Sequence, residues 1–136
     1  MAIPELPSEQ HKKCALLLEA IWRSVPSEYK SRYRREIWRQ FQEEVESAAR
    51  TTNSLSVFVN SLCSRFAASF HDKEAQAVGE VLSGADDRAM LKLLREQTVL
   101  LVVAVRLANQ ERQEEWKEAH LQEDELDMAQ QEKEKV

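Results

Sequence analysis

The chain has 136 residues, enough for one domain to bury a hydrophobic core without disulfides or a structural metal. Charged residues make up 32% and hydrophobic residues 43% of the sequence, a balance that excludes a wholly disordered protein. With two glycines and three prolines the chain has too few turn residues for a strand-rich fold, so we expect an all-α protein.

The net charge of −5 is unevenly distributed along the chain. Residues 111–136 carry ten acidic and four basic side chains, which gives this part −6 and leaves residues 1–110 near +1. We therefore divide the chain into an extended N-terminal segment at 1–7, a helical bundle domain at 8–110 and an acidic tail at 111–136. The composition of the tail predicts partial disorder or a projecting helix.

The first two predicted helices are separated by Pro26 and Ser27. The first is predicted because its apolar residues recur at spacings of three and four. It is capped by Ser8 and ends near Val25. The second reaches about Arg50, since its apolar residues follow at a strict spacing of four. These residues are Tyr29, Tyr33, Ile37, Phe41 and Val45.

Two further helices are predicted between residues 54 and 84. A cluster of capping residues at 51–54 introduces a helix that keeps its apolar period as far as Phe70. Asp72 opens a short helix that ends at Gly84. We expect Gly84 to adopt the left-handed conformation that often follows a helix C-terminus.

The last predicted helix opens at Asp86 or Asp87, and no glycine or proline between residues 88 and 136 ends it. Val99 and Val103 fall in the middle of its polar face, so the helix is apolar all round for two turns. These valines must be covered by the protein's own helices, which we favour, or by a second chain. The expected architecture is a five-helix bundle in which four helices surround this hydrophobic central helix, with a charged C-terminal extension.

No enzyme or metal-binding motif occurs in the sequence. Cys63 and His71 are eight residues apart, about 12 Å along a continuous helix, so they and Asp72 do not form a nucleophile with its base. The three histidines lie on separate segments without metal-ligand spacing. We predict no catalytic residue, no metal, no cofactor and no small-molecule substrate.

The cysteines and the N-terminus indicate an intracellular protein, either cytoplasmic or nuclear. Cys14 and Cys63 lie among apolar residues in no spaced motif, which predicts buried thiols and fits a reducing compartment. The N-terminus lacks the features of a secretory signal. The longest apolar run, at 99–105, has seven residues against the roughly 20 that span a bilayer.

The segment 30–39 contains five basic residues and one acid. On a helical wheel Arg32, Arg35 and Arg39 form a stripe opposite the apolar face of the second helix. Such a stripe can bind the phosphates of RNA, DNA or an anionic lipid surface. The alternative is that Arg39 pairs with neighbouring glutamates, and a domain of near-zero charge lacks the broad basic surface of nucleic-acid-binding proteins.

Two tryptophans are candidate anchors for a protein partner. Trp38 lies between the buried and basic faces of the second helix, and tryptophan is enriched at interface hot spots. A boundary tryptophan that covers the domain's own core fits equally well. Trp116, with Leu121 and Leu126, can anchor the acidic tail on a partner, although such tails more often maintain solubility.

The leading functional hypothesis is a non-enzymatic helical adaptor or subunit of a larger complex. It would bind protein partners, or a second copy of itself, through Trp38, Val99, Val103 and Trp116. The alternative is a small helical subunit of a nucleoprotein assembly that contacts phosphates through Arg32, Arg35 and Arg39. An enzyme ranks third.

Overall fold

A computed structural model describes residues 8–113 and shows seven helices and no strand over that range. The labelled helices are α1 (Glu9–Ser24), α2 (Ser27–Arg32), α3 (Ile37–Thr51), α4 (Leu55–Phe66), α5 (Asp72–Ser83) and α6 (Asp87–Glu96). The last helix starts at residue 98 and is described as far as residue 113. The predicted all-α class is confirmed, whereas the N-terminal segment, Trp116 and the charged extension lie outside the described residues.

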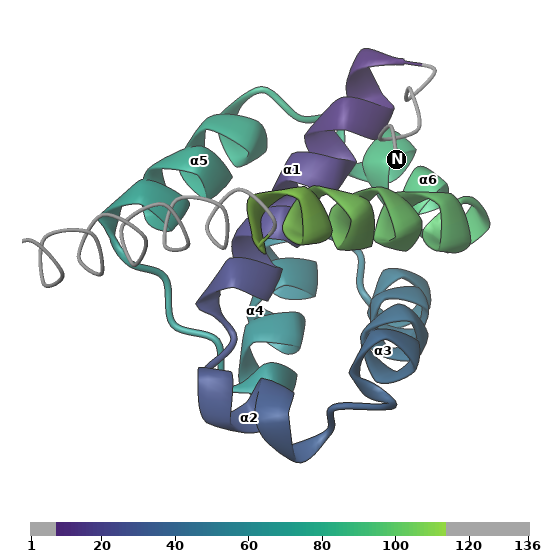
Figure 1. The fold of residues 1–136 in the computed structure, drawn as a ribbon. Helices are drawn as coiled ribbons and strands as arrows, with labels where there is room; N and C mark the ends of the chain where they lie inside the picture. Colours follow the sequence, from purple (N-terminus) through teal and green to yellow (C-terminus); the bar gives the residue numbers. More distant parts are fainter. Residues whose placement is uncertain (1–7, 114–136) are drawn as a thin grey trace, which may run out of the picture.

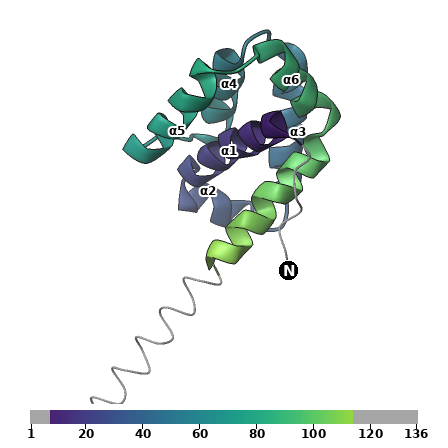
Figure 2. The same ribbon diagram turned by 90° about the horizontal axis from the view of Figure 1, so that it is seen from above.

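Helix α1 occupies the centre of the bundle, a place that the sequence had suggested for the last helix. It packs most extensively against α5 and also contacts α4 and α6, while α3 packs against α6. The last helix crosses α1 from the outside (Figure 1), and α4 and α5 lie on the other side of α1 (Figure 2). The prediction of a central last helix was therefore wrong for this domain.

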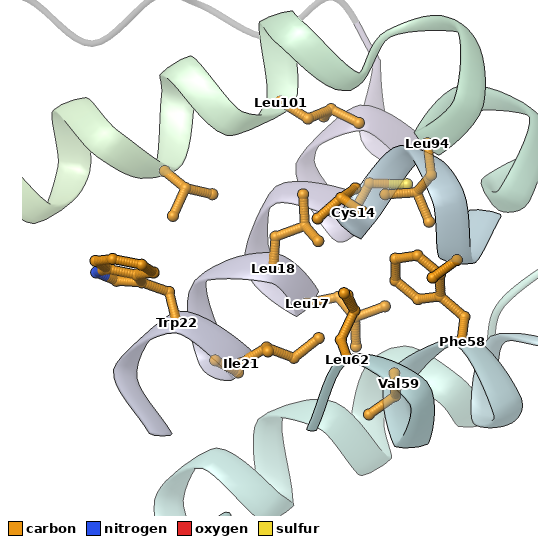
Figure 3. Packing of buried hydrophobic residues seen from close by; sticks show 14 of the residues in the cluster. Cys14, Leu17, Leu18, Ile21, Trp22, Phe58, Val59, Leu62, Leu94 and Leu101 are labelled. Carbon is orange, nitrogen blue, oxygen red and sulfur yellow. The ribbon is translucent and has the colours of Figure 1, made fainter. Parts of the chain in front are cut away.

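The hydrophobic core explains why α1 is central. Its buried residues extend over about 200° of the helix circumference, too wide an arc for a helix that packs on one side only. The buried side chains of α1 meet those of α4, α6 and the last helix (Figure 3). The buried residues of α1 are Cys14, Leu17, Leu18, Ala20, Ile21 and Trp22.

The predicted second helix is divided into α2 and α3 by a turn at residues 33–36. The Tyr33 carbonyl oxygen accepts hydrogen bonds from the backbone N–H groups of Glu36, at 3.0 Å, and Ile37, at 2.8 Å. Apolar residues spaced four apart are rotated by about 40° per step around a helix. One straight helix therefore cannot keep five of them on one narrow face. The turn corrects this drift and leaves both Tyr29 and Phe41 packed against Phe66.

The third predicted helix ends four residues earlier than expected, at Phe66. Ala67 has a φ of 53°, in the left-handed region, and the Ala68 N–H donates to the Cys63 carbonyl at 2.9 Å. Gly84 has a φ of −113°, so the left-handed conformation predicted there was wrong. Asp86, the N-cap residue of α6, follows only two residues after Gly84, and the chain makes this connection without a left-handed residue.

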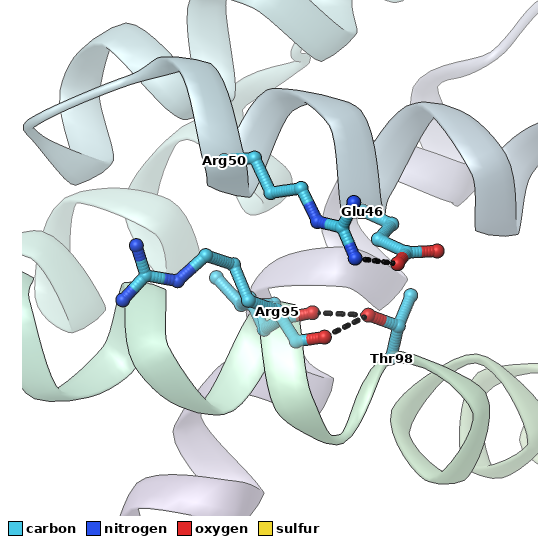
Figure 4. A network of polar contacts seen from close by, with 5 residues as sticks. Glu46, Arg50, Arg95 and Thr98 are labelled. Carbon is cyan, nitrogen blue, oxygen red and sulfur yellow. Dashed lines mark hydrogen bonds and ion pairs between the residues drawn. The ribbon is translucent and has the colours of Figure 1, made fainter.

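The last predicted helix is interrupted at Gln97, which ends α6 and begins the next helix. The Gln97 N–H donates to the Leu93 carbonyl at 2.7 Å, and its own carbonyl accepts from the Leu101 N–H at 3.0 Å. The buried Thr98 hydroxyl donates to the carbonyls of Leu94 and Arg95 (Figure 4). This break allows α6 to pack on α3 while the last helix packs on α1.

Candidate functional site

Val99 and Val103 are exposed to solvent, with 58% and 40% of their surface accessible. The favoured expectation, that the protein's own helices cover them, is therefore wrong. The last helix packs through Leu101, Val102 and Val105, all buried. At about 100° per residue the two valines fall on the opposite side of that helix.

The exposed valines belong to a longer apolar strip. Leu100 and Leu107 are half-buried and, by helical spacing, lie between the two valines and the buried face. We call Val99, Leu100, Val103 and Leu107 the outer strip. Its position along one side of a helix is the arrangement that a second helix recognises.

A groove lies between α1 and the last helix, with a volume of about 330 Å³. Its apolar lining consists of Ala15, Leu16, Ala104, Val105 and Ala108. Leu16 is 53% exposed, so the largest apolar side chain of the α1 wall is accessible. Three of the four exposed large apolar residues in the described chain thus lie on α1 and the last helix, the fourth being Val57 on α4.

The polar residues of the groove lining are Lys12 and Glu19. Glu19 pairs with Arg23 at 3.2 Å and also with Arg112 of the last helix. Two guanidinium groups therefore share one carboxylate. Lys12 is exposed and has no carboxylate within 4 Å among residues 8–113.

Trp38 is half-buried and packs against the domain's own core. Its ring stacks on that of Trp22, with centroids 4.0 Å apart, and meets Phe41 edge-on. The Lys30 ammonium lies 4.7 Å from the Trp22 ring centroid, and partial burial lowers the pKa of Lys30. Trp38 thus has the position of a boundary tryptophan, and its role as a partner anchor stays a prediction.

The predicted arginine stripe does not lie along one helix, because its members belong to three different elements. Arg32 is the last residue of α2, Arg35 lies in the turn and Arg39 is on α3. Arg39 pairs with Glu36 at 3.4 Å and Glu43 at 3.9 Å. The turn at 33–36 causes this separation.

A second, polar pocket of about 420 Å³ lies between α2, α3 and α4. Its charged groups are largely paired, since Arg65 contacts Glu44 at 3.2 Å and Arg39 contacts Glu43. The lining contains no histidine, cysteine or serine that could act as a nucleophile or base. The residues that line it are Tyr29, Tyr33, Arg39, Gln40, Glu43, Glu44, Arg65 and Phe66.

The two cysteines differ in burial. Cys14 is fully buried, as predicted, with its Sγ 3.8 Å from the Met90 carbonyl oxygen, and burial raises the pKa of its thiol to about 12. Cys63 is only half-buried, and desolvation raises the pKa of this thiol as well. Both cysteines are therefore neutral thiols near pH 7 rather than reactive thiolates.

Neither a metal centre nor a membrane span is found in residues 8–113. No three His, Cys, Asp or Glu side chains of this range are grouped to hold a metal ion. No helix within it is long and apolar enough to cross a bilayer.

Comparisons with known proteins found no match among protein-family models, curated proteins or solved structures. The outer strip and the groove are the features of the described surface that best support a function. The sequence pattern identified Val99 and Val103 but missed Leu16. Leu16 precedes the buried Leu17 and Leu18, and its position about 100° away from Leu17 was a signal that could have identified it.

Proposed function

We propose that the chain is a non-enzymatic helical interaction module that binds a protein partner through the outer strip and the groove. The observation that carries this proposal is the exposure of Val99 and Val103 on a helix whose opposite face lies in the core. Single exposed apolar residues are common on protein surfaces, whereas several along one side of a helix are typical of an interaction site.

The physical gain from covering this surface is hydrophobic. Burial of apolar area stabilises a complex by about 25 cal/mol per Å², before the cost of association is subtracted. The groove of about 330 Å³ has the size of a small binding cavity, large enough to accept the apolar side chains of a docked helix. A protein partner is therefore the class of ligand that this surface fits best.

The test is affinity capture with the tagged full chain and with the double variant Val99→Asp/Val103→Asp, followed by mass spectrometry. The control is Val57→Asp, which places the same charge at an exposed valine of α4. We expect the double variant to lose a set of proteins that the wild type and the control retain, with or without nuclease. An identical set for all three chains would contradict the proposal.

A second candidate function, a subunit of a nucleoprotein assembly, is favoured by three exposed arginines at the turn. Arg32, Arg34 and Arg35 have no carboxylate within 4 Å among the described residues, unlike the paired Arg39. Changing all three to Gln should weaken RNA or DNA binding and reduce its salt dependence by about one unit of slope for each phosphate that is no longer neutralised. Arg39→Gln is the matched control. Absence of wild-type binding at low salt would exclude this candidate.

A further inference from the structure

We propose that the corner where α1, α2 and α3 meet binds an oxyanion, the carboxylate or phosphate group of a ligand, through the Trp22 indole N–H and the Lys30 ammonium. Trp22 lies near the end of α1 and Lys30 lies on α2. The site shares no residue with the outer strip or the groove, so the inference goes beyond the proposed function.

The first donor of the site is a buried N–H group without a partner. Trp22 has only 4% of its surface accessible, and its indole Nε1 makes no hydrogen bond. Within residues 8–113 it is the only fully buried side-chain nitrogen or oxygen atom of which this is true. The nitrogen edge of the ring points away from the core leucines (Figure 3). Because buried polar groups are almost always hydrogen-bonded, this donor points to a bound acceptor.

The second donor is the Lys30 ammonium, which lies 4.7 Å from the centroid of the Trp22 ring, in cation–π contact with it. Lys30 is half-buried, and its ammonium has neither an ion pair nor a hydrogen bond with any residue of the described range. Desolvation lowers the pKa of Lys30 by penalising the charged form. Two partly or fully desolvated donors thus share one place without an acceptor, and an anion supplies both the acceptor and the opposite charge.

One oxyanion is large enough to bridge the two donors. An indole ring is only a few bond lengths wide, so the Lys30 Nζ is at most about 7 Å from the Trp22 Nε1. The two oxygen atoms of a carboxylate are about 2.2 Å apart, and each accepts an N–H bond at about 2.9 Å. A carboxylate or phosphate group therefore bridges nitrogen atoms up to about 8 Å apart.

The neighbouring aromatic rings fix one donor, while the other donor can adapt. The Trp22 ring stacks on Trp38, with centroids 4.0 Å apart, and meets Phe41 at 5.4 Å. Its N–H therefore has a set direction. The ammonium of Lys30 is carried on a flexible stem, so it can meet an anion at the surface and turn with it towards the edge of the ring. Trp38 is half-buried, so this side of the cluster reaches the surface.

The charge of the adjoining turn favours an anion over a neutral acceptor. Arg32, Arg34 and Arg35 are exposed and have no carboxylate partner in the part of the chain that the structure describes. Together with Lys30 they place four cations within six consecutive residues that include no acid. Their combined field raises the local concentration of anions at this corner.

The experiment follows the indole N–H resonances of the isotopically labelled full chain by NMR. Sodium phosphate or sodium acetate replaces sodium chloride at constant ionic strength, so that general screening does not change. The chain contains three tryptophans, and the variant Trp22→Phe identifies the resonance of Trp22. We expect this resonance to move downfield and to saturate at millimolar anion, because the N–H gains a hydrogen bond.

Variants of Lys30 test the second donor. Lys30→Gln removes the ammonium and should weaken binding about tenfold, since a charged hydrogen bond is lost. Lys30→Arg keeps the charge and should retain most of the affinity. Lys13→Gln is the matched control, because Lys13 is also half-buried but lies on α1 outside the site. Circular dichroism checks that each variant keeps its helicity.

The two anions also distinguish the source of the ligand. Saturation by acetate alone would indicate a carboxylate-bearing ligand, and saturation by phosphate alone would indicate a phosphorylated one. A Trp22 resonance that saturates with neither anion would overturn the inference, as would equal movement in the wild type and in Lys30→Gln. Either result leaves the proposed function intact, because its test depends on Val99 and Val103.

Discussion

Side chains only two residues apart on the last helix have opposite environments, because the helix packs on α1 through one face. Leu101 is completely buried, whereas Val99 and Val103 are exposed. The apolar character of all three was evident in the sequence. Which of them the domain covers depends on where the helix is placed, and that placement depends on the break at Gln97.

The exposure of the valines predicts the stability of their variants. Val99→Asp/Val103→Asp should lower the free energy of unfolding by less than about 1 kcal/mol, since neither charge enters the core. Leu101→Ala, in the same helix, should cost about 2–5 kcal/mol because it leaves a cavity. Urea denaturation followed by circular dichroism measures both. A double variant as unstable as Leu101→Ala would mean that the valines are covered within the monomer.

The buried thiol of Cys14 predicts a pH dependence of stability. Burial raises its pKa from 9.0 to about 12, so between these values the unfolded chain loses this proton while the folded chain keeps it. The free energy of unfolding should therefore fall as pH rises above about 9, by up to about 1.4 kcal/mol per pH unit. Denaturation of wild type and Cys14→Ala from pH 7 to pH 11 should show a shallower decline for the variant. Parallel declines would contradict the assignment.

At the scale of elements, helical periodicity located the helices but not all their breaks. Capping by Ser8 and the start of a helix after Ser54 were predictable, and both side chains accept the expected backbone hydrogen bonds. The turn at 33–36 and the break at Gln97 contain neither glycine nor proline. Tertiary packing produces them, because α3 and the last helix each have to face a different neighbour from the helix that precedes them.

The left-handed cap of α4 allows a prediction for a single residue. Ala67 has a φ of 53°, a conformation that costs a residue with a Cβ atom about 1 kcal/mol and costs glycine little. Ala67→Gly should therefore raise the free energy of unfolding by a few tenths to about 1 kcal/mol. Ala68→Gly, at a neighbour without a positive φ, should instead lower it. Destabilisation by both changes would show that the left-handed cap is absent.

For the whole molecule, composition predicted the all-α class and the pattern predicted most core residues, but the arrangement of the helices was inaccessible. Amphipathicity shows that a helix has a buried face and does not show which helix covers it. The last helix looked central because it is apolar all round for two turns. In the structure α1 is central, and the extra apolar residues of the last helix remain on the surface.

Thiol labelling of Val103→Cys in a Cys63→Ser background tests whether the outer strip is a binding surface. Val57→Cys, in the same background, is the matched control on α4. Both thiols should react rapidly in the dissociated chain, since both valines are exposed. In the captured complex we expect strong protection of position 103 and unchanged labelling at position 57. Equal labelling of position 103 in the dissociated and assembled states would show that the outer strip binds no partner.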